Sequence, residues 1–461
     1  MRTIVESRKN VMLLWHKSKP DKGRYRLMKY LLEVEVEDGL LIYNVVTSEM
    51  VLLDSSEAET IKSLPSDYCP AMDPLIAGHF IVKEDFDESK VVSELRAVLR
   101  KLDVAERVTG FTILPTTECN ARCFYCFESN HKHCTMTENL ASDVVKYITD
   151  MCKSKKVSLG WFGGEPLVAH KRISQICAAL HEKGIEVRSS MVSNGYLFDH
   201  DLIQKAKTEW NLGSVQITLD GTEDVYNKTK AYINPRDNPF QRVLGNIDEL
   251  LDNGIIVSVR LNVTDKNAAD LSKLVDELAA RFAEKKGFTC YAHAVYEDVG
   301  FEPLSYDNDV KEQVNSQTVM LDSKLEELGL LGKMGRLPYL RIRNCMADND
   351  SCRLIYPDGT IGKCENMSSD MCMGDIYKDI TDPVMNGQYN TSVILDGCKD
   401  CFLYPHCVNL KLCPETGRCS KAKVEWKRQR FRELMKTNYK SLEKIDTETQ
   451  TEPSDLVECE S

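Results

Sequence analysis

The sequence contains no apolar stretch long enough to cross a membrane, and it begins without the features of an export signal. Residues 1–17 hold a short apolar island between charged residues, but neither the long apolar core nor the small-residue cleavage site of a signal peptide. We therefore predict a cytoplasmic protein that has no membrane partner. With 461 residues, the chain is long enough for about three domains with cores of their own.

Positive charge is also scarce. The chain has 59 Lys and Arg residues against 71 Asp and Glu residues, which gives a formal net charge of -12 at pH 7. A surface with this balance does not neutralise phosphates, so no nucleic acid is expected as a partner.

Cysteine, in contrast, is abundant, with 18 copies. In a chain without an export signal, the reducing cytosol favours metal or sulfur chemistry over a disulfide framework. Three cysteines stand close together in CNARCFYC, at Cys119, Cys123 and Cys126. Three thiols on one short loop cannot pair into disulfides without leaving one over, so we interpret them as metal ligands.

Residues 106–300 alternate between strand-like and helix-like segments. The helical patterns include 138–152 and 240–254, and the six short apolar runs lie at residues 110–115, 157–163, 186–195, 214–221, 255–263 and 288–296. This alternation predicts an α/β fold with a parallel sheet, open or closed into part of a barrel. In such folds the chemistry lies at the carboxyl ends of the strands, and Cys119 stands in the first of these loops.

CNARCFYC resembles the cysteine motif of the radical S-adenosylmethionine (radical SAM) enzymes. In that family, three thiolates hold a 4Fe-4S cluster whose open iron binds the amino and carboxylate groups of S-adenosylmethionine. Reductive cleavage of this cofactor yields a 5'-deoxyadenosyl radical, which abstracts a substrate hydrogen. The resemblance covers about residues 106–300 and implies the partial (β/α)6 TIM-like barrel of the family.

Loops after later strands resemble the cofactor-binding motifs of that family. WFGGEP is similar to the motif whose backbone and Glu receive the methionine ammonium, while VSNGYLF and VQITLDG resemble loops that hold the ribose and the carboxylate. Tyr125 stands where the family has an aromatic residue whose backbone contacts adenine, and Lys230 where relatives often have an Arg. The implied cofactor-binding residues are Tyr125, Gly163, Gly164, Glu165, Pro166, Ser193, Asn194, Thr218, Asp220 and Lys230.

Residues 345–419, which we call the second cysteine block, contain eight further cysteines if Cys372 is set aside, and eight thiols suit two more fully ligated 4Fe-4S clusters. Paired zinc sites are the alternative, because C-x2-C followed by later cysteines also suits tetrahedral zinc. The block is similar to the SPASM domain, the twin-cluster extension of radical SAM enzymes that modify peptides and proteins. The resemblance implies Cys345, Cys352, Cys364 and Cys413 as ligands of one auxiliary cluster, and Cys398, Cys401, Cys407 and Cys419 as ligands of the other.

The second cysteine block departs from the family pattern at Cys413, which follows Cys407 after five intervening residues where three are usual. Loss of Cys413 as a ligand would leave one iron open to substrate. Glu365 stands where the sulfatase-maturing branch has an acidic residue proposed as proton acceptor, so we take it as a candidate catalytic residue; a surface Glu on a turn is the alternative. Cys372 is left outside the ligand set.

Residues outside 106–300 are predicted to form separate segments. A hairpin about residues 30–46 and helical patterns later in residues 1–105 fit a winged-helix-like peptide-recognition module, although an extension that only packs on the core fits equally well. The remaining predicted segments are a helical linker at 301–340, the twin-cluster domain with a basic, solvated C-terminal helix at 341–436, and a disordered acidic tail at 437–461.

Together these resemblances imply a radical SAM/SPASM oxidoreductase that modifies a ribosomally synthesised precursor peptide. It would use S-adenosylmethionine and three 4Fe-4S clusters, one radical and two auxiliary, and take electrons from a reductase, flavodoxin or ferredoxin. The N-terminal module would bind the leader of the peptide by strand addition. A thioether is the favoured product, ahead of a C–C crosslink. The alternatives are formylglycine formation, as in anaerobic sulfatase maturases, peptide epimerisation, and a zinc-stapled binding protein.

Overall fold

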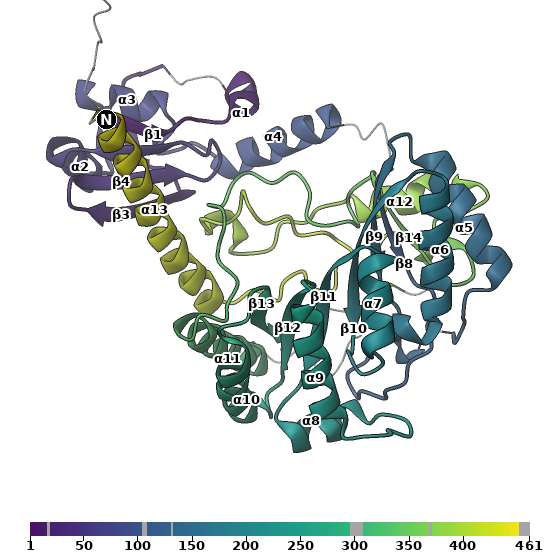
Figure 1. The fold of residues 1–461 in the computed structure, drawn as a ribbon. Coiled ribbons are helices and arrows are strands. Elements are labelled where there is room, and N and C mark those ends of the chain that lie inside the picture. Colours follow the sequence, from purple (N-terminus) through teal and green to yellow (C-terminus); the bar gives the residue numbers. More distant parts are fainter. Residues whose placement is uncertain (16–18, 104–107, 131, 296–307, 368–370, 451–461) are drawn as a thin grey trace, which may run out of the picture.

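The computed structural model describes residues 1–15, 19–103, 108–130, 132–295, 308–367 and 371–450. Its centre is a ten-stranded mixed sheet (Figure 1). The six expected strands are confirmed and pair in parallel in chain order. They are β8 (Gly110–Ile113), β9 (Lys156–Trp161), β10 (Glu186–Ser193), β11 (Leu212–Leu219), β12 (Ile256–Val263) and β13 (Phe288–Ala294).

Helices return the chain between these strands, and their apolar faces form one continuous core with the sheet. They are α5 (Glu138–Met151), α6 (His170–Glu182), α7 (His200–Thr208), α8 (Glu223–Lys230), α9 (Pro239–Asp252) and α10 (Ala268–Phe282). Side-chain caps set where several begin, since Thr137, Asp199 and Asn238 each accept a hydrogen bond from a backbone N–H in the first turn. This packing directs the strand-to-helix loops to one edge of the sheet.

The sheet does not end at β8 but extends beyond the six expected strands. Strand β14 (Cys352–Ile355) pairs in parallel with β8. The sheet then continues antiparallel through β15 (Thr360–Gly362), β16 (Gly374–Asp375) and β17 (Asp379–Ile380). Strand β14 satisfies backbone groups that β8 would otherwise leave unpaired at a sheet edge. Part of the second cysteine block therefore belongs to the same sheet as residues 110–294.

Residues 1–103 contain two small antiparallel sheets. One has the order β1 (Arg2–Val5), β5 (Met50–Leu53), β4 (Gly39–Asn44), β3 (Leu31–Val36); the other has the order β6 (Ser66–Asp67), β2 (Arg24–Leu27), β7 (Ile81–Lys83). The helices are α1 (Lys9–Leu14), α2 (Ser55–Lys62), α3 (Asp73–Ala77) and α4 (Glu88–Leu102). The expected hairpin is confirmed as β3 and β4, whereas the winged-helix-like assignment stays a prediction.

The N-terminal unit shares a core with the C-terminal part of the chain. Helix α13 (Lys421–Gln450) crosses the four-stranded sheet (Figure 1). Its side chains Phe431, Met435 and Tyr439 pack in one apolar cluster with β3, β4 and residues 402–404. Residues 437–450 are therefore helical rather than disordered, because Tyr439 continues the i, i+4 stripe that this core buries. The same stripe shows that α13 is not solvated all round. Residues 451–461 lie outside the described residues.

Two arginines on α4 join the N-terminal unit to the second cysteine block. The buried guanidinium of Arg96 donates hydrogen bonds to the backbone carbonyls of Arg341 (2.9 Å), Pro405 (3.0 Å) and Cys407 (3.2 Å). Arg100 forms an ion pair with the buried Asp348 at 2.5 Å. A buried cation needs such acceptors, so these contacts hold α4 against the cysteine-rich loops.

The helix expected in the linker is confirmed as α11 (Asn308–Glu327), which packs against β13 and α10. A further short helix, α12 (Pro383–Tyr389), lies within the second cysteine block. Among the described residues, no helix combines the length and the apolar character that a membrane span requires.

Candidate active site

A cavity of about 290 Å³ opens at the carboxyl ends of the parallel strands. The thiols of Cys119, Cys123 and Cys126 contribute to its wall. The expected cofactor-binding residues that also line it are Tyr125, Gly163, Gly164, Ser193, Asn194, Thr218 and Lys230. Glu165, Pro166 and Asp220 are buried and do not line it.

The loop that carries the three cysteines is held by backbone contacts on two sides. The N–H of Glu165 donates to the carbonyl of Glu118 (2.9 Å), and the N–H of Arg122 donates to the carbonyl of Lys230 (2.9 Å). Burial raises the pKa of Cys119 to about 12, and the thiols of Cys123 and Cys126 add to the increase. The three thiols are thus close to one another, and a bound metal centre would have to displace the proton that burial favours on Cys119.

The two glycines of WFGGEP let its loop pack against the cysteine loop. A Cβ on Gly163 would lie 2.1 Å from the carbonyl oxygen of Thr116, and one on Gly164 would lie 2.5 Å from those of Thr117 and Glu118. Gly163 also has a φ of +124°, which side chains rarely adopt. The close backbone approach expected of these glycines is therefore observed, but the neighbour is the cysteine loop itself.

Replacing Gly164 by alanine is expected to push the cysteine loop away from WFGGEP and to lower stability by about 1–3 kcal/mol, as overpacking does. Less iron should be bound after anaerobic reconstitution. Gly245→Ala is the matched control, because a Cβ at that helical position meets nothing within 4 Å. Thermal unfolding and iron content measure both effects, and equal values for the two variants would contradict the packing role.

Glu165 joins the loop after β9 to the loop after β10. Its carboxylate accepts hydrogen bonds from the N–H of Leu167 (3.1 Å), the hydroxyl of Ser193 (2.9 Å) and the N–H of Asn194 (2.8 Å). Burial raises the pKa of Glu165 to about 7, although these three donors favour the charged form. The contacts make Glu165 a positioning residue, while a direct bond to a cofactor ammonium stays a prediction.

Behind the cavity wall, Asp220 is the centre of a buried polar network. Its Oδ1 accepts hydrogen bonds from the hydroxyl of Tyr125 (2.7 Å) and from Nδ2 of Asn262 (2.9 Å). Its Oδ2 lies 2.9 Å from Nζ of Lys230, and both side chains are only 2% exposed. Lys230 also donates to Oγ1 of Thr218 (2.7 Å). Burial alone would lower the pKa of Lys230. Asp220, Tyr125 and other nearby groups together have the larger effect, so the pKa of the ammonium is raised.

The network brings together four of the predicted residues and one that sequence reasoning missed, Asn262. Its amide also donates to the hydroxyl of Tyr125 (2.9 Å). The available signal was an amide residue near the carboxyl end of the strand-like run IIVSVRLNV, where parallel-sheet folds place their chemistry.

Residues 113–278 match the family model of the Radical SAM superfamily. The chain contains a radical SAM domain. This domain extends from the end of β8 into α10, and so includes the cysteine loop, WFGGEP and the Asp220 network. None of the curated proteins matches the chain.

Solved structures of anSMEcpe share the fold of this chain. Native anSMEcpe with bound S-adenosylmethionine aligns with a TM-score of 0.55 and 15% identity over 73% of this chain and 100% of that chain. The same protein with S-adenosylmethionine and the Cp18Cys peptide has a TM-score of 0.53 and 15% identity over 73% and 99%. SuiB of Streptococcus suis bound to the precursor peptide SuiA has a TM-score of 0.49 and 15% identity over 86% and 99%. At such identities the likeness shows the fold alone.

Radical SAM domains use a 4Fe-4S cluster and S-adenosylmethionine, and the residues present fit both groups. Three thiols on one loop suit a cluster that keeps one iron open. Among the described residues, Oδ1 of Asn262 and Nδ2 of Asn120 are buried without hydrogen-bond partners. Asn262 lines the cavity and Asn120 directly follows Cys119. A cofactor with amino and carboxylate groups is able to pair with such atoms.

The far wall of the cavity was not predicted from the sequence. Arg260 and His293 reach it from β12 and β13, while Glu415 and Arg418 reach it from the second cysteine block. Glu415 forms an ion pair with Arg418 at 2.6 Å and lies 3.8 Å from Nε2 of His293. Burial, with nearby Arg260, lowers the pKa of His293 to about 3, so this imidazole is neutral near pH 7.

Glu365 lies close to the cavity wall but does not line it. Glu128 lines the wall instead, directly after the cysteine motif. Burial raises the pKa of Glu128 to about 8, and the neighbouring Glu365 adds to the increase. Two carboxyl groups therefore lie close together beside the cavity. Sequence reasoning found only Glu365, which does not line it.

The thiols of the second cysteine block gather into two groups. Cys413 adds to the raised pKa of Cys345, and Cys345 and Cys413 both add to the raised pKa of Cys364, so these three thiols lie close together. The thiols of Cys398, Cys401 and Cys419 add to the raised pKa of Cys407, and these four thiols form the other group. Cys352 stands at the start of β14, with its sulfur 3.1 Å from where a Cβ on Gly110 would lie. The expected ligand roles of all eight stay predictions.

Among the described residues, no three His, Cys, Asp or Glu side chains converge to hold one metal ion. Thiolates on a single zinc ion all lie about 2.3 Å from it and so must crowd together. A 4Fe-4S cluster takes each thiolate on a different iron, and its ligands stand further apart.

Proposed function

We propose that this radical SAM protein is a SPASM-type maturase that modifies a ribosomally synthesised precursor peptide. The observation that carries the proposal is the shared cavity: the radical SAM cysteine loop forms one wall, and Asn366, Glu415 and Arg418 of the second cysteine block contribute to another. This arrangement brings the radical chemistry next to the proposed auxiliary clusters. anSMEcpe, which shares the fold, binds the Cp18Cys peptide, and we extend peptide binding to this chain as part of the proposal.

In the proposed mechanism, Cys119, Cys123 and Cys126 would hold a 4Fe-4S cluster, whose chemistry when bound would be the one-electron reduction that cleaves S-adenosylmethionine to a 5'-deoxyadenosyl radical. Asn262, Thr218 and Lys230 hold the cofactor at the strand ends, while Glu165 keeps the two neighbouring loops in register. Phe127 and Phe162 stack with ring centroids 6.3 Å apart and shield the cavity from water.

The favoured product is a thioether between a peptide Cys and a carbon of the same peptide. Formation of this bond would remove one hydrogen atom from the carbon, one proton from the thiol and one electron. Bound S-adenosylmethionine would supply the hydrogen acceptor, and an auxiliary cluster held by the second cysteine block would supply the electron acceptor. Glu128, which lines the cavity, would receive that proton, and the neighbouring Glu365 is the candidate final acceptor. A C–C crosslink would use the same steps with a second carbon in place of the sulfur.

Anaerobic coexpression with the small open reading frame next to the gene, followed by mass spectrometry of the peptide, tests this proposal. A mass loss of two hydrogens, together with the disappearance of one free thiol, would support a thioether. The same mass loss with all thiols retained would indicate a C–C crosslink, whereas an unchanged mass with inverted residues would indicate epimerisation. Formylglycine in the product would favour the alternative of a sulfatase-maturase-like enzyme. An unmodified peptide, despite active cofactor cleavage, would contradict peptide modification.

Three clusters predict about twelve irons, and as many acid-labile sulfides, in each chain. Zinc without sulfide would instead support the binding-protein alternative. Cys413→Ala is expected to lower iron by up to about four per chain, or to change the auxiliary cluster spectrum, because Cys413 groups with Cys345 and Cys364. Cys372→Ala serves as the control outside the ligand set. Iron, sulfide and spectra equal to wild type in Cys413→Ala would show an iron open to substrate sulfur.

A further inference from the structure

The edge strands of the four-stranded N-terminal sheet are β3 and β1. At one edge, Nε of Arg432 on α13 donates to the backbone carbonyl of Glu33 on β3 (2.9 Å). At the other edge, β1 pairs antiparallel with β5, with Arg2 opposite Leu52. A partner peptide that joins this sheet as a strand must therefore displace the Arg432 contact at β3, displace β1, or add outside β1.

Strand β1 is a poor template for a further strand. Its register slips between Thr3 and Val5, so one extra residue interrupts the ladder. Such bulges at sheet edges obstruct further pairing. Addition outside β1 is thus disfavoured, and the position that β1 occupies on β5 is the better docking place.

Strand β1 is also held loosely by its side chains. Arg2, Thr3 and Val5 are exposed, and Ile4 is only half-buried. In β5, by contrast, all residues except Leu52 are fully buried. Main-chain hydrogen bonds to β5 and the side chains of Arg2 and Ile4 therefore attach β1, and another extended segment with suitable side chains can replace them.

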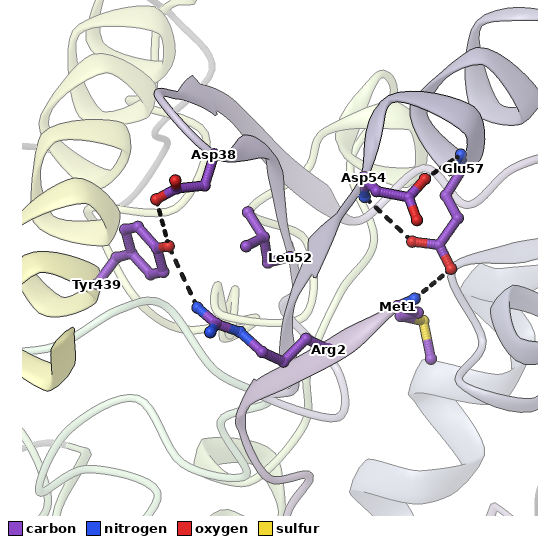
Figure 2. Close-up of a pocket in the computed structure, with 7 residues that line it drawn as sticks. All are labelled: Met1, Arg2, Asp38, Leu52, Asp54, Glu57 and Tyr439. Atoms are coloured by element: carbon purple, nitrogen blue, oxygen red, sulfur yellow. Dashed lines mark hydrogen bonds and ion pairs between the residues drawn. The ribbon is translucent and has the colours of Figure 1, made fainter. Parts of the chain in front are cut away.

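Beside β1 lies a pocket with an acidic lining (Figure 2). Three of its residues carry carboxylates: Asp38, in the turn between β3 and β4, and Asp54 and Glu57, at the start of α2. Hydrogen bonds from the backbone N–H groups of the first helical turn lower the pKa of Asp54 and keep it charged.

Figure 2 shows Arg2 extending from β1 into this pocket. Its guanidinium donates to the hydroxyl of Tyr439 (3.2 Å), which donates in turn to Asp38 (2.8 Å). Two residues later, Ile4 packs against the apolar cluster under α13. The segment that pairs with β5 therefore has a basic residue, Arg2, followed two positions later by an apolar residue, Ile4.

We propose that β1 is an exchangeable edge strand that holds the leader-binding position on β5 until a precursor peptide with a basic-x-apolar segment replaces it. This inference rests on the proposed function and adds the location of the docking edge and the charge of the partner. Besides Arg2, the pocket holds the ammonium of Met1, which pairs with Glu57. When β1 leaves together with Met1, the remaining lining residues present the carboxylates of Asp38, Asp54 and Glu57 without a cation among them. The incoming basic side chain restores the charge balance that Arg2 provides.

The probe is an acetylated, fluorescein-labelled peptide with the sequence of residues 1–8, MRTIVESR. A variant lacking residues 2–6 is expected to bind it at least about tenfold more tightly than the full chain does, because a competing strand lowers the available fraction of the site. The peptide with Glu in place of its first Arg should bind the deletion variant about tenfold more weakly. Equal affinity for both proteins, or for both peptides, would overturn the inference.

Matched variants in the deletion background localise the effect. Asp38→Asn should weaken binding of the probe, whereas Glu35→Gln, which removes an exposed carboxylate from β3, should not. If the deletion variant fails to fold, the full-length chain provides the test by hydrogen exchange. A saturating amount of probe should then increase exchange at residues 2–5 while residues 50–53 stay protected, and unchanged protection of residues 2–5 would contradict replacement.

The binding assay needs neither cluster nor S-adenosylmethionine, so its failure is distinguishable from failure of the proposed function. A chain that binds the probe as expected but leaves every coexpressed peptide unmodified would contradict peptide modification only. A chain that modifies its peptide with the same KM in the presence and absence of residues 2–6 would contradict the role of β1 only.

Discussion

Replacement of Cys119, Cys123 or Cys126 by alanine is expected to abolish release of 5'-deoxyadenosine. Each thiol is one of three on the loop that lines the cavity, and a cluster with an open iron has no spare protein ligand. About four irons per chain should be lost while the iron of the second cysteine block remains. Anaerobic reconstitution, reduction with dithionite and chromatography of the nucleoside products measure both effects.

Cys134→Ala is the matched control for these variants, because Cys134 lies shortly after the motif but outside its spacing. It should retain wild-type iron content and cofactor cleavage. Nucleoside release from a triple variant at Cys119, Cys123 and Cys126 would show that another group of thiols initiates the radical reaction, and the assignment of the cavity would then be wrong.

Lys230→Met is expected to destabilise the protein by about 3–5 kcal/mol, because it leaves the charge of Asp220 buried without its cation. Nζ of Lys230 lies 2.9 Å from the carboxylate, with both side chains 2% exposed. Denaturant titration under anaerobic conditions measures the loss. Binding of S-adenosylmethionine should fall as well, since Tyr125 and Thr218 depend on the same network.

A double variant separates charge from packing. Adding Asp220→Leu to Lys230→Met removes the unpaired carboxylate and should recover a large part of the lost stability. The surface control is Lys285→Met, which breaks an exposed pair with Asp252 and should leave the unfolding midpoint almost unchanged. A single Lys230→Met variant as stable as wild type would contradict the buried ion pair.

Local patterns in the sequence determined the secondary structure. The six parallel strands, the hairpin of β3 and β4, and the helix Glu88–Leu102 lie where alternation, turn residues and helical spacing predict them. These features depend on neighbours within a few positions, so they are readable without a fold. The three-cysteine motif is local in the same sense, and it led to the radical SAM domain that the family model confirms.

Only the tertiary structure decided which distant segments meet. β14 pairs with β8, β1 with β5, and α13 crosses the N-terminal sheet. Backbone hydrogen bonds are chemically alike in every strand, so the spacing of side chains does not reveal which edge a strand will join. The same holds for Asn262 and Lys230, whose ordinary local contexts concealed contacts to Asp220. Sequence therefore determined the elements and the cysteine chemistry, and packing determined the cavity walls and the edge that β1 covers.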